Sequence, residues 1–171
     1  YIHFGGDEVR HDQWEMAPHV TDFMNKNNLK TVTQLQSFFV KRVSHINTSK
    51  GRKPMGWNDI LVDAKNLPKE TAIMSWLGAD AIKQAVKNGF ESVATPTAPM
   101  YFDITQADRD DGTMSDLAYG NINTIARVYQ YDPSQGLSPE EEKLVLGVQA
   151  NQWTALPQEV KDMNVQNFPR L

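Results

Sequence analysis

The sequence predicts an α/β fold with a parallel β-sheet, and two observations lead to this prediction. Short apolar runs typical of strands alternate along the chain with amphipathic segments typical of helices. Five of the runs end in aromatic or acidic residues, as strands do in a barrel of βα units, where such side chains collect on one face. With 171 residues, 40% of them hydrophobic, the chain can bury one ordinary core, so we expect residues 1–171 to form a single segment of one domain.

The composition argues against several classes of function. The net charge is −4 and the lysines and arginines are scattered, which argues against nucleic acid or an anionic membrane as a partner. There is no transmembrane run, and the absence of cysteine excludes disulfides and thiolate catalysis. Because the chain starts inside an apolar run without an initiator methionine, we expect it to be a piece of a longer protein.

The first predicted strand covers residues 1–4 and leads into two glycines and two carboxylates. Neighbouring side chains of a strand point to opposite faces, so Asp7 and Glu8 could not reach one ligand if the pleat continued. Gly5 and Gly6 remove this restriction, because glycine adopts backbone angles that let the chain turn. We expect one carboxylate to stay ionised and the other to keep its proton to about neutral pH, which is the division of labour that general acid catalysis needs.

Two other interpretations of this stretch remain open. It could be a solvated loop that opens a helix, with Asp7 as the N-cap. Alternatively, a metal ion could bind a set of four side chains whose spacing matches no zinc signature, namely His3, Asp7, Glu8 and His11.

The other predicted elements follow in chain order. Helices are expected at 20–28, at 33–46 with Thr33 as N-cap, at 79–87 before the cap Asn88-Gly89, at 122–131, after the cap Ser138, and at 157–163. Strands are expected at 53–57, 71–76, 91–95 and 145–153. Residues 9–17 and 108–120 are expected to be loops.

The ends of the predicted strands carry residues that could form a pocket. They are Asp7-Glu8, Trp57, Trp76, 101–103 and Trp153. The carboxyl ends of barrel strands share one face, which is where such enzymes build their sites. Any single tryptophan could instead be an ordinary core aromatic, but three of the four tryptophans follow strands, which favours a pocket.

Several of these segments resemble a known family. His3-Phe4-Gly5-Gly6-Asp7-Glu8 resembles the H-x-G-G-D-E signature of glycoside hydrolase family 20, the β-N-acetylhexosaminidases. Four later segments resemble successive blocks of that family in the expected order: Gly56-Trp57, Met74-Ser75-Trp76, Tyr101-Phe102-Asp103 and residues 147–154. The resemblance implies the C-terminal portion of a (β/α)8 TIM barrel, from about the fourth strand to the eighth.

The resemblance also implies a reaction. Family members release terminal β-linked N-acetylglucosamine or N-acetylgalactosamine with retention, and the acetamido oxygen of the substrate acts as the nucleophile and gives an oxazolinium intermediate. By resemblance, Glu8 would protonate the leaving oxygen and later activate water. Asp7 would accept a hydrogen bond from the acetamido N–H, and Tyr101 would donate its hydroxyl to the acetamido carbonyl.

The rest of the implied site binds the sugar. Trp57, Trp76 and Trp153 would wall the N-acetyl group and exclude water from the intermediate, and Asp103 would contact outer sugar hydroxyls. No cofactor and no metal is implied, and the expected partner is a glycan with a terminal N-acetylhexosamine. This substrate class favours an extracellular, cell-surface or periplasmic location.

The chain departs from the family pattern at three places, which are Ala155 after Trp153-Thr154 where Glu is usual, Asn58-Asp59 where Asp-Glu is usual, and Leu77 where Arg is frequent. A carboxylate expected to bind sugar hydroxyls is therefore missing. A degenerate family member that binds carbohydrate without turnover is the alternative, and an unrelated α/β enzyme that uses His3 and Glu8 with a metal is a third possibility.

Half a barrel would leave two unpaired strand edges and an uncovered interior. We therefore expect the segment to be inactive alone. We also expect it to associate through those edges, either with the missing N-terminal half of the barrel or with a second copy.

Overall fold

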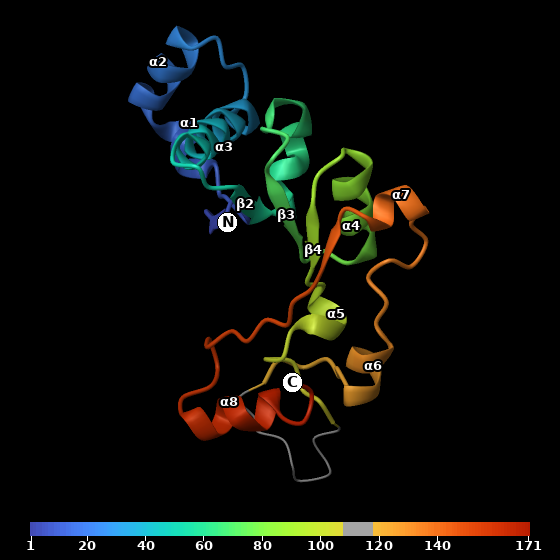
Figure 1. The fold of residues 1–171 in the computed structure, drawn as a ribbon. Coiled ribbons are helices and arrows are strands. Elements are labelled where there is room, and N and C mark those ends of the chain that lie inside the picture. Colours follow the sequence, from blue (N-terminus) through green and yellow to red (C-terminus); the bar gives the residue numbers. More distant parts are fainter. Residues whose placement is uncertain (108–117) are drawn as a thin grey trace.

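A computed structural model describes residues 1–107 and 118–171 of the chain. Its centre is a five-stranded parallel sheet in the order β1-β2-β3-β4-β5 (Figure 1). The strands are β1 (Ile2–His3), β2 (Pro54–Trp57), β3 (Ala72–Ser75), β4 (Ser92–Ala94) and β5 (Val145–Val148). The predicted parallel α/β sheet is therefore confirmed, and each strand lies within the range expected from the sequence.

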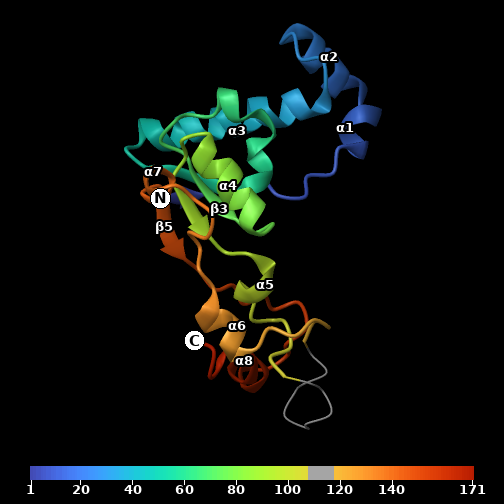
Figure 2. The ribbon, with the colours of Figure 1, turned by 90° about the vertical axis from the view of Figure 1, so that its right-hand side faces the viewer.

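The helices divide between two regions. They are α1 (Asp12–Met16), α2 (Pro18–Lys26), α3 (Val32–Ser49), the 3₁₀ helix η1 (Asn58–Asn66), α4 (Ala79–Lys87), α5 (Thr97–Met100), α6 (Ile125–Gln130), α7 (Pro139–Glu142) and α8 (Val160–Asn167). Helices α3 and α4 pack against the sheet. Figures 1 and 2 both show α5, α6 and α8 gathered beyond the strands. We call this part the C-terminal lobe (residues 97–107, 118–130 and 149–171), and residues 1–96 with 139–148 the sheet region.

Three local predictions are wrong. The loop expected at 9–17 contains helix α1, whose first turn carries two acidic residues that suit the helix dipole. The N-cap of α3 is Thr31, which accepts the N–H of Gln34, and not Thr33. Helix α8 begins at Val160 and not at residue 157. The helix expected at 122–131 is confirmed as α6, which spans Ile125–Gln130. The loop expected at 108–120 lies outside the described residues, apart from 118–120.

The sheet region has an apolar core. Phe90, Ile73 and Ala85 are completely buried, and they pack with Val40, Ile60, Leu61 and Leu67 in one cluster between α3, η1, β3 and α4. The helix predicted at 79–87 has the bounds of α4, and it buries Ile82 and Val86 as expected. Gly89 follows this helix with φ of +79°, a conformation that glycine adopts without strain, which confirms the predicted glycine cap.

The C-terminal lobe is organised around a buried arginine. Arg170 is 2% exposed, and its guanidinium donates to the carbonyl oxygens of Phe102 (2.6 Å), Ile104 (2.9 Å) and Asn123 (3.0 Å). Its Nε also donates to the carbonyl of Gln166. Burial lowers the pKa of Arg170 to about 10, so the group remains charged at neutral pH. One cation therefore ties the end of the chain to the segment after α5.

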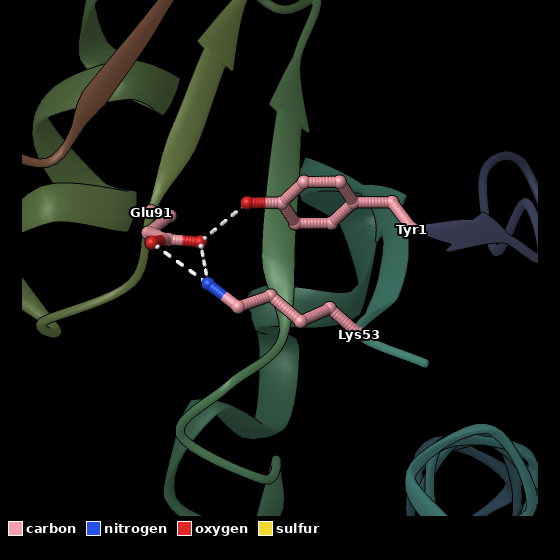
Figure 3. Close-up of polar contacts among 3 residues, drawn as sticks. All are labelled: Tyr1, Lys53 and Glu91. Atoms are coloured by element: carbon pink, nitrogen blue, oxygen red, sulfur yellow. Dashed lines mark hydrogen bonds and ion pairs between the residues drawn. The ribbon is translucent and has the colours of Figure 1, made fainter. Parts of the chain in front are cut away.

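A polar cluster joins three strands at their amino ends (Figure 3). The Tyr1 hydroxyl donates to Glu91 Oε2 at 2.8 Å, and Lys53 Nζ donates to both Glu91 oxygens at 3.0 and 2.9 Å. The hydrogen bond from Lys53, followed by that from Tyr1, lowers the pKa of Glu91. These three residues lie beside the starts of β1, β2 and β4, a position that contributes to stability and not to chemistry in barrels of parallel strands.

Large apolar side chains are exposed at the borders of the sheet region. Phe39 and Ile46 on α3 are 60% and 57% exposed, while Ile2 on β1 and Leu146 on β5 are each 45% exposed. No helix in the described part of the chain is both long and apolar enough to cross a bilayer. The exposed residues agree with the expectation of uncovered borders, and what covers them stays a prediction.

Candidate active site

The turn after β1 depends on its two glycines. Gly5 and Gly6 have φ of +80° and +101°, which are values that residues with a side chain rarely adopt. A Cβ on Gly6 would lie 2.5 Å from Ile60 Cγ2, so the site has no room for one. The prediction that glycines turn the chain here is confirmed. The interpretation of Asp7 as a helix N-cap is wrong, because α1 starts at Asp12 with His11 before it.

The neighbouring strand end lies close to this turn. The N–H of Trp57 donates to the Gly5 carbonyl oxygen at 3.0 Å. A Cβ on Gly56 would lie 2.9 Å from the same oxygen, so this close approach of the two backbones requires glycine at position 56. The carboxylates after β1 and the indole at the end of β2 are thereby placed side by side.

The predicted strand-end residues surround one cavity of about 280 Å³. The ring centroid of Trp153 lies 6.1 Å from that of Trp57 and 6.0 Å from that of Tyr101, and both pairs are tilted toward edge-to-face packing. The residues that line the cavity are Asp7, Glu8, Trp57, Trp76, Tyr101 and Trp153. The structure therefore brings together two carboxylates, three indoles and a phenol from both regions of the molecule.

The protonation of two neighbouring groups is set by burial. Burial raises the pKa of Tyr101, so its hydroxyl keeps its proton at neutral pH and can donate a hydrogen bond. Burial lowers the pKa of His3, whose Nδ1 accepts the N–H of Gly5 at 3.1 Å. The imidazole is therefore neutral, with its proton on Nε2, and it packs edge-on against Trp57 with the centroids 5.0 Å apart.

Asp103 lies apart from the other predicted site residues. It is 2% exposed and does not line the cavity, and its Oδ1 has no hydrogen-bond partner within the part of the chain that the structure describes. Burial raises its pKa, and the charge of Arg170 opposes this effect. Its contact with outer sugar hydroxyls stays a prediction.

The side chains of the metal interpretation do not come together. His11 Nε2 lies 2.9 Å from Gln36 Oε1, and its ring stacks on Trp14. Over residues 1–107 and 118–171, no three His, Asp or Glu side chains are grouped so that they could hold a metal ion. The four-residue set of His3, Asp7, Glu8 and His11 therefore does not form a ligand cluster.

Sequence reasoning missed the supporting role of two residues that it treated only as departures from a pattern. Asn58 Oδ1 accepts the N–H of Trp76 at 2.9 Å, and Asp59 Oδ2 accepts the indole N–H of Trp76 at 2.9 Å. Their position directly after Trp57, at the same strand end, was the available signal. Leu77 and Ala155, the other departures, are both exposed.

Larger hollows occur elsewhere on the surface. One of about 420 Å³ lies between α3 and η1 and is lined by Thr33, Lys41 and Asp63 among others. It is larger than the cavity at the strand ends, but its polar groups do not converge with an acid pair and an aromatic wall. The chemistry of its lining residues, and not its volume, therefore makes the strand-end cavity the candidate active site.

Residues 1–171 match the family model of the catalytic domain of glycosyl hydrolase family 20. The chain belongs to this family. It is 31% identical over 173 residues to a β-hexosaminidase of Porphyromonas gingivalis and 27% identical over 176 residues to a β-hexosaminidase of Vibrio furnissii. Both alignments include 100% of this chain, which spans only 22% and 28% of the length of these relatives.

Solved structures of the family share the fold. The chain superposes on an exo-β-N-acetylglucosaminidase of Vibrio harveyi with a TM-score of 0.84 and 23% identity, over 99% of this chain and 26% of the other. It superposes on a chitobiase of Flavobacterium johnsoniae with a TM-score of 0.77 and 28% identity, over 99% and 24% of the two chains. The family resemblance and the α/β barrel architecture expected from the sequence are thus confirmed.

Proposed function

We propose that the protein containing this chain is a retaining exo-β-N-acetylhexosaminidase, and that residues 1–171 form the C-terminal portion of its catalytic barrel. The observation that carries the proposal is the cavity in which Asp7 and Glu8 face three indoles and a phenol. The names of the related hexosaminidases support the same substrate class. Each relative is several times longer than this chain, which supports a larger parent protein.

The proposed reaction has two steps. In the first, the acetamido carbonyl oxygen of the substrate attacks the anomeric carbon while the bond from that carbon to the leaving oxygen breaks, and Glu8 gives its proton to the leaving oxygen. In the second, the Glu8 carboxylate takes a proton from water as the water opens the oxazolinium ring at the anomeric carbon. The anomeric configuration is inverted twice and is therefore retained.

The other cavity residues support the internal nucleophile. Asp7 accepts the acetamido N–H and offsets the positive charge that develops on the ring. The neutral Tyr101 hydroxyl donates to the acetamido oxygen and orients it for attack. The indoles of Trp57, Trp76 and Trp153 pack around the acetamido group and reduce the access of bulk water to the intermediate.

The role of Glu8 as the acid is tested with two leaving groups. Glu8→Gln in the full-length protein should lower kcat/KM for N,N′-diacetylchitobiose by roughly 10²- to 10⁴-fold, because a sugar hydroxyl is a poor leaving group without a proton. The loss should be much smaller for 4-nitrophenyl N-acetyl-β-D-glucosaminide, whose phenolate leaves readily. Glu15→Gln, on α1 and outside the cavity, is the matched control and should retain the wild-type rate. Equal rates for wild type and Glu8→Gln would contradict the assignment, and sugar binding without turnover by the wild type would indicate a binding protein instead.

A further inference from the structure

One carboxylate outside the cavity connects the proposed acid to an aromatic wall. Asp59 is the second residue of η1 and does not line the cavity. Its Oδ2 accepts the indole N–H of Trp76 at 2.9 Å, while its Oδ1 accepts the backbone N–H of Glu8 at 3.4 Å. The first distance is typical of a good hydrogen bond, and the second is long. Asp59 thus contacts two neighbouring parts of the cavity from behind.

The backbone of Glu8 needs such support. Its φ is +48°, in the left-handed region that costs a residue with a side chain about 1 kcal/mol or more. Such a conformation persists only where the surroundings hold it. The preceding glycines are both left-handed as well, so the local sequence offers little stiffness of its own. Among residues 1–107 and 118–171, Asp59 is the only hydrogen-bond partner of the Glu8 N–H.

The orientation of Trp76 depends on the same 3₁₀ helix. Asn58, 7% exposed, accepts the backbone N–H groups of Trp76 and Leu77 at 2.9 and 3.3 Å, which fixes the chain after β3. The indole ring can still rotate about its side-chain bonds. A hydrogen bond from its N–H to a carboxylate is stronger than one to a neutral acceptor, and it holds the ring in a single orientation.

We propose that Asp59 is a positioning residue that sets the separation between the carboxyl group of Glu8 and the indole of Trp76. The proposal rests on the function proposed above. Because Asp59 does not line the cavity, its loss should alter the geometry in which the acid meets the leaving oxygen more than it alters the affinity for the sugar. A group misplaced by about 1 Å can lower a rate by about 100-fold. The sequence patterns predicted this positioning role for no residue.

Kinetics of three variants of the full-length protein test this proposal. Asp59→Ala should lower kcat roughly 10- to 100-fold with KM changed less than about 3-fold, and Asp59→Glu should recover part of the loss because a carboxylate is retained. Asp63→Ala is the matched control, since Asp63 lies in the same 3₁₀ helix but, among the described residues, its carboxylate accepts hydrogen bonds only from the exposed Asn66. A folded Asp59→Ala variant with wild-type kcat would overturn the proposal.

A double-mutant cycle separates positioning from general stabilisation. Trp76→Phe keeps an aromatic ring but has no N–H, so Asp59→Asn should lower kcat less in this background than in the wild type. A purely structural role would give equal losses in the two backgrounds, which would contradict the proposal.

A readout without turnover keeps the test independent of the proposed function. In protein labelled with ¹⁵N-tryptophan, the indole N–H signal lost in Trp76→Phe is the signal of Trp76. Asp59→Asn should shift this signal and speed its exchange with solvent, whereas Asp63→Ala should not. An unshifted, equally protected signal would overturn the proposal even if the wild type hydrolyses nothing. Failure of the proposed function would appear instead as a wild type without turnover, or as turnover that Glu8→Gln leaves unchanged.

Discussion

The sheet region and the C-terminal lobe are held together by different forces. The sheet region packs around Phe90 and Ile73, which are completely buried apolar side chains in one continuous cluster. In the lobe, the buried groups include Arg170, Asn123 and Gln166, which are 2%, 1% and 0% exposed. The hydrophobic effect is non-directional, while a hydrogen bond depends on the distance and angle between donor and acceptor.

This difference matters because the cavity takes residues from both regions. The carboxylates and two indoles come from the sheet region, while Tyr101 and Trp153 come from the lobe. Asn123 Nδ2 donates to the Tyr101 carbonyl at 3.2 Å, and Arg170 donates to the Asn123 carbonyl at 3.0 Å. A polar chain of contacts therefore supports the backbone of Tyr101 in the lobe, while the carboxylates follow a turn in which Gly6 packs against the core residue Ile60.

The largest expected effect on stability comes from the apolar core. Phe90→Ala should lower the free energy of unfolding by about 3–5 kcal/mol, because it leaves a cavity in a fully packed cluster. Denaturant titration measures the change. Tyr129→Ala, at an aromatic side chain that is 72% exposed, should change the free energy of unfolding by less than about 0.5 kcal/mol. Similar losses in both variants would contradict the role assigned to the apolar core.

A substitution of Arg170 in the C-terminal lobe is expected to lower stability less than Phe90→Ala does, and to lower activity more. Arg170→Met should lower the free energy of unfolding by about 2–3 kcal/mol, since it leaves several buried carbonyl oxygens without a donor. At a temperature where both variants are folded, Arg170→Met should reduce kcat/KM more than Phe90→Ala does. Arg127→Met, which removes only an exposed bond to Ile122, is the control. A folded Arg170→Met enzyme with full activity would break the proposed link between the lobe and Tyr101.

The same contrast explains what the sequence could predict. Apolar periodicity located β3 and α4 within a residue, because these elements bury their side chains in the order that the pattern indicates. The glycine turn was predictable because only glycine adopts its backbone angles. The role of Arg170 was not predictable, because its acceptors are backbone carbonyls between residues 102 and 166. Every sequence has such carbonyls. The support from Asp59 was missed for a similar reason, since its partners lie 51 and 17 residues away.

The smallest expected effect concerns the cluster at the amino ends of the strands. The pKa of Glu91 is lowered in the folded state, first by the hydrogen bond from Lys53 and then by that from Tyr1. The folded state therefore binds fewer protons, so this stabilisation is present above about pH 4.3 and is lost as the pH falls through the folded value. Lys53→Met should lower Tm by at most about 2 °C at pH 6, because the pair is exposed and screened. The difference from wild type should shrink at pH 3 and in high salt; a difference that grows at pH 3 would contradict this account.

The central claim is that the acetamido group of the substrate, held in the cavity shared by the two regions, is the nucleophile. It is tested most directly by kcat/KM for 4-nitrophenyl glucosaminides whose acetamido methyl group carries none, one, two or three fluorine atoms. Fluorine withdraws electrons from the carbonyl oxygen, so the account predicts a steep, progressive fall in kcat/KM along the series. A flat series would contradict it and would indicate an enzymic nucleophile or attack by water.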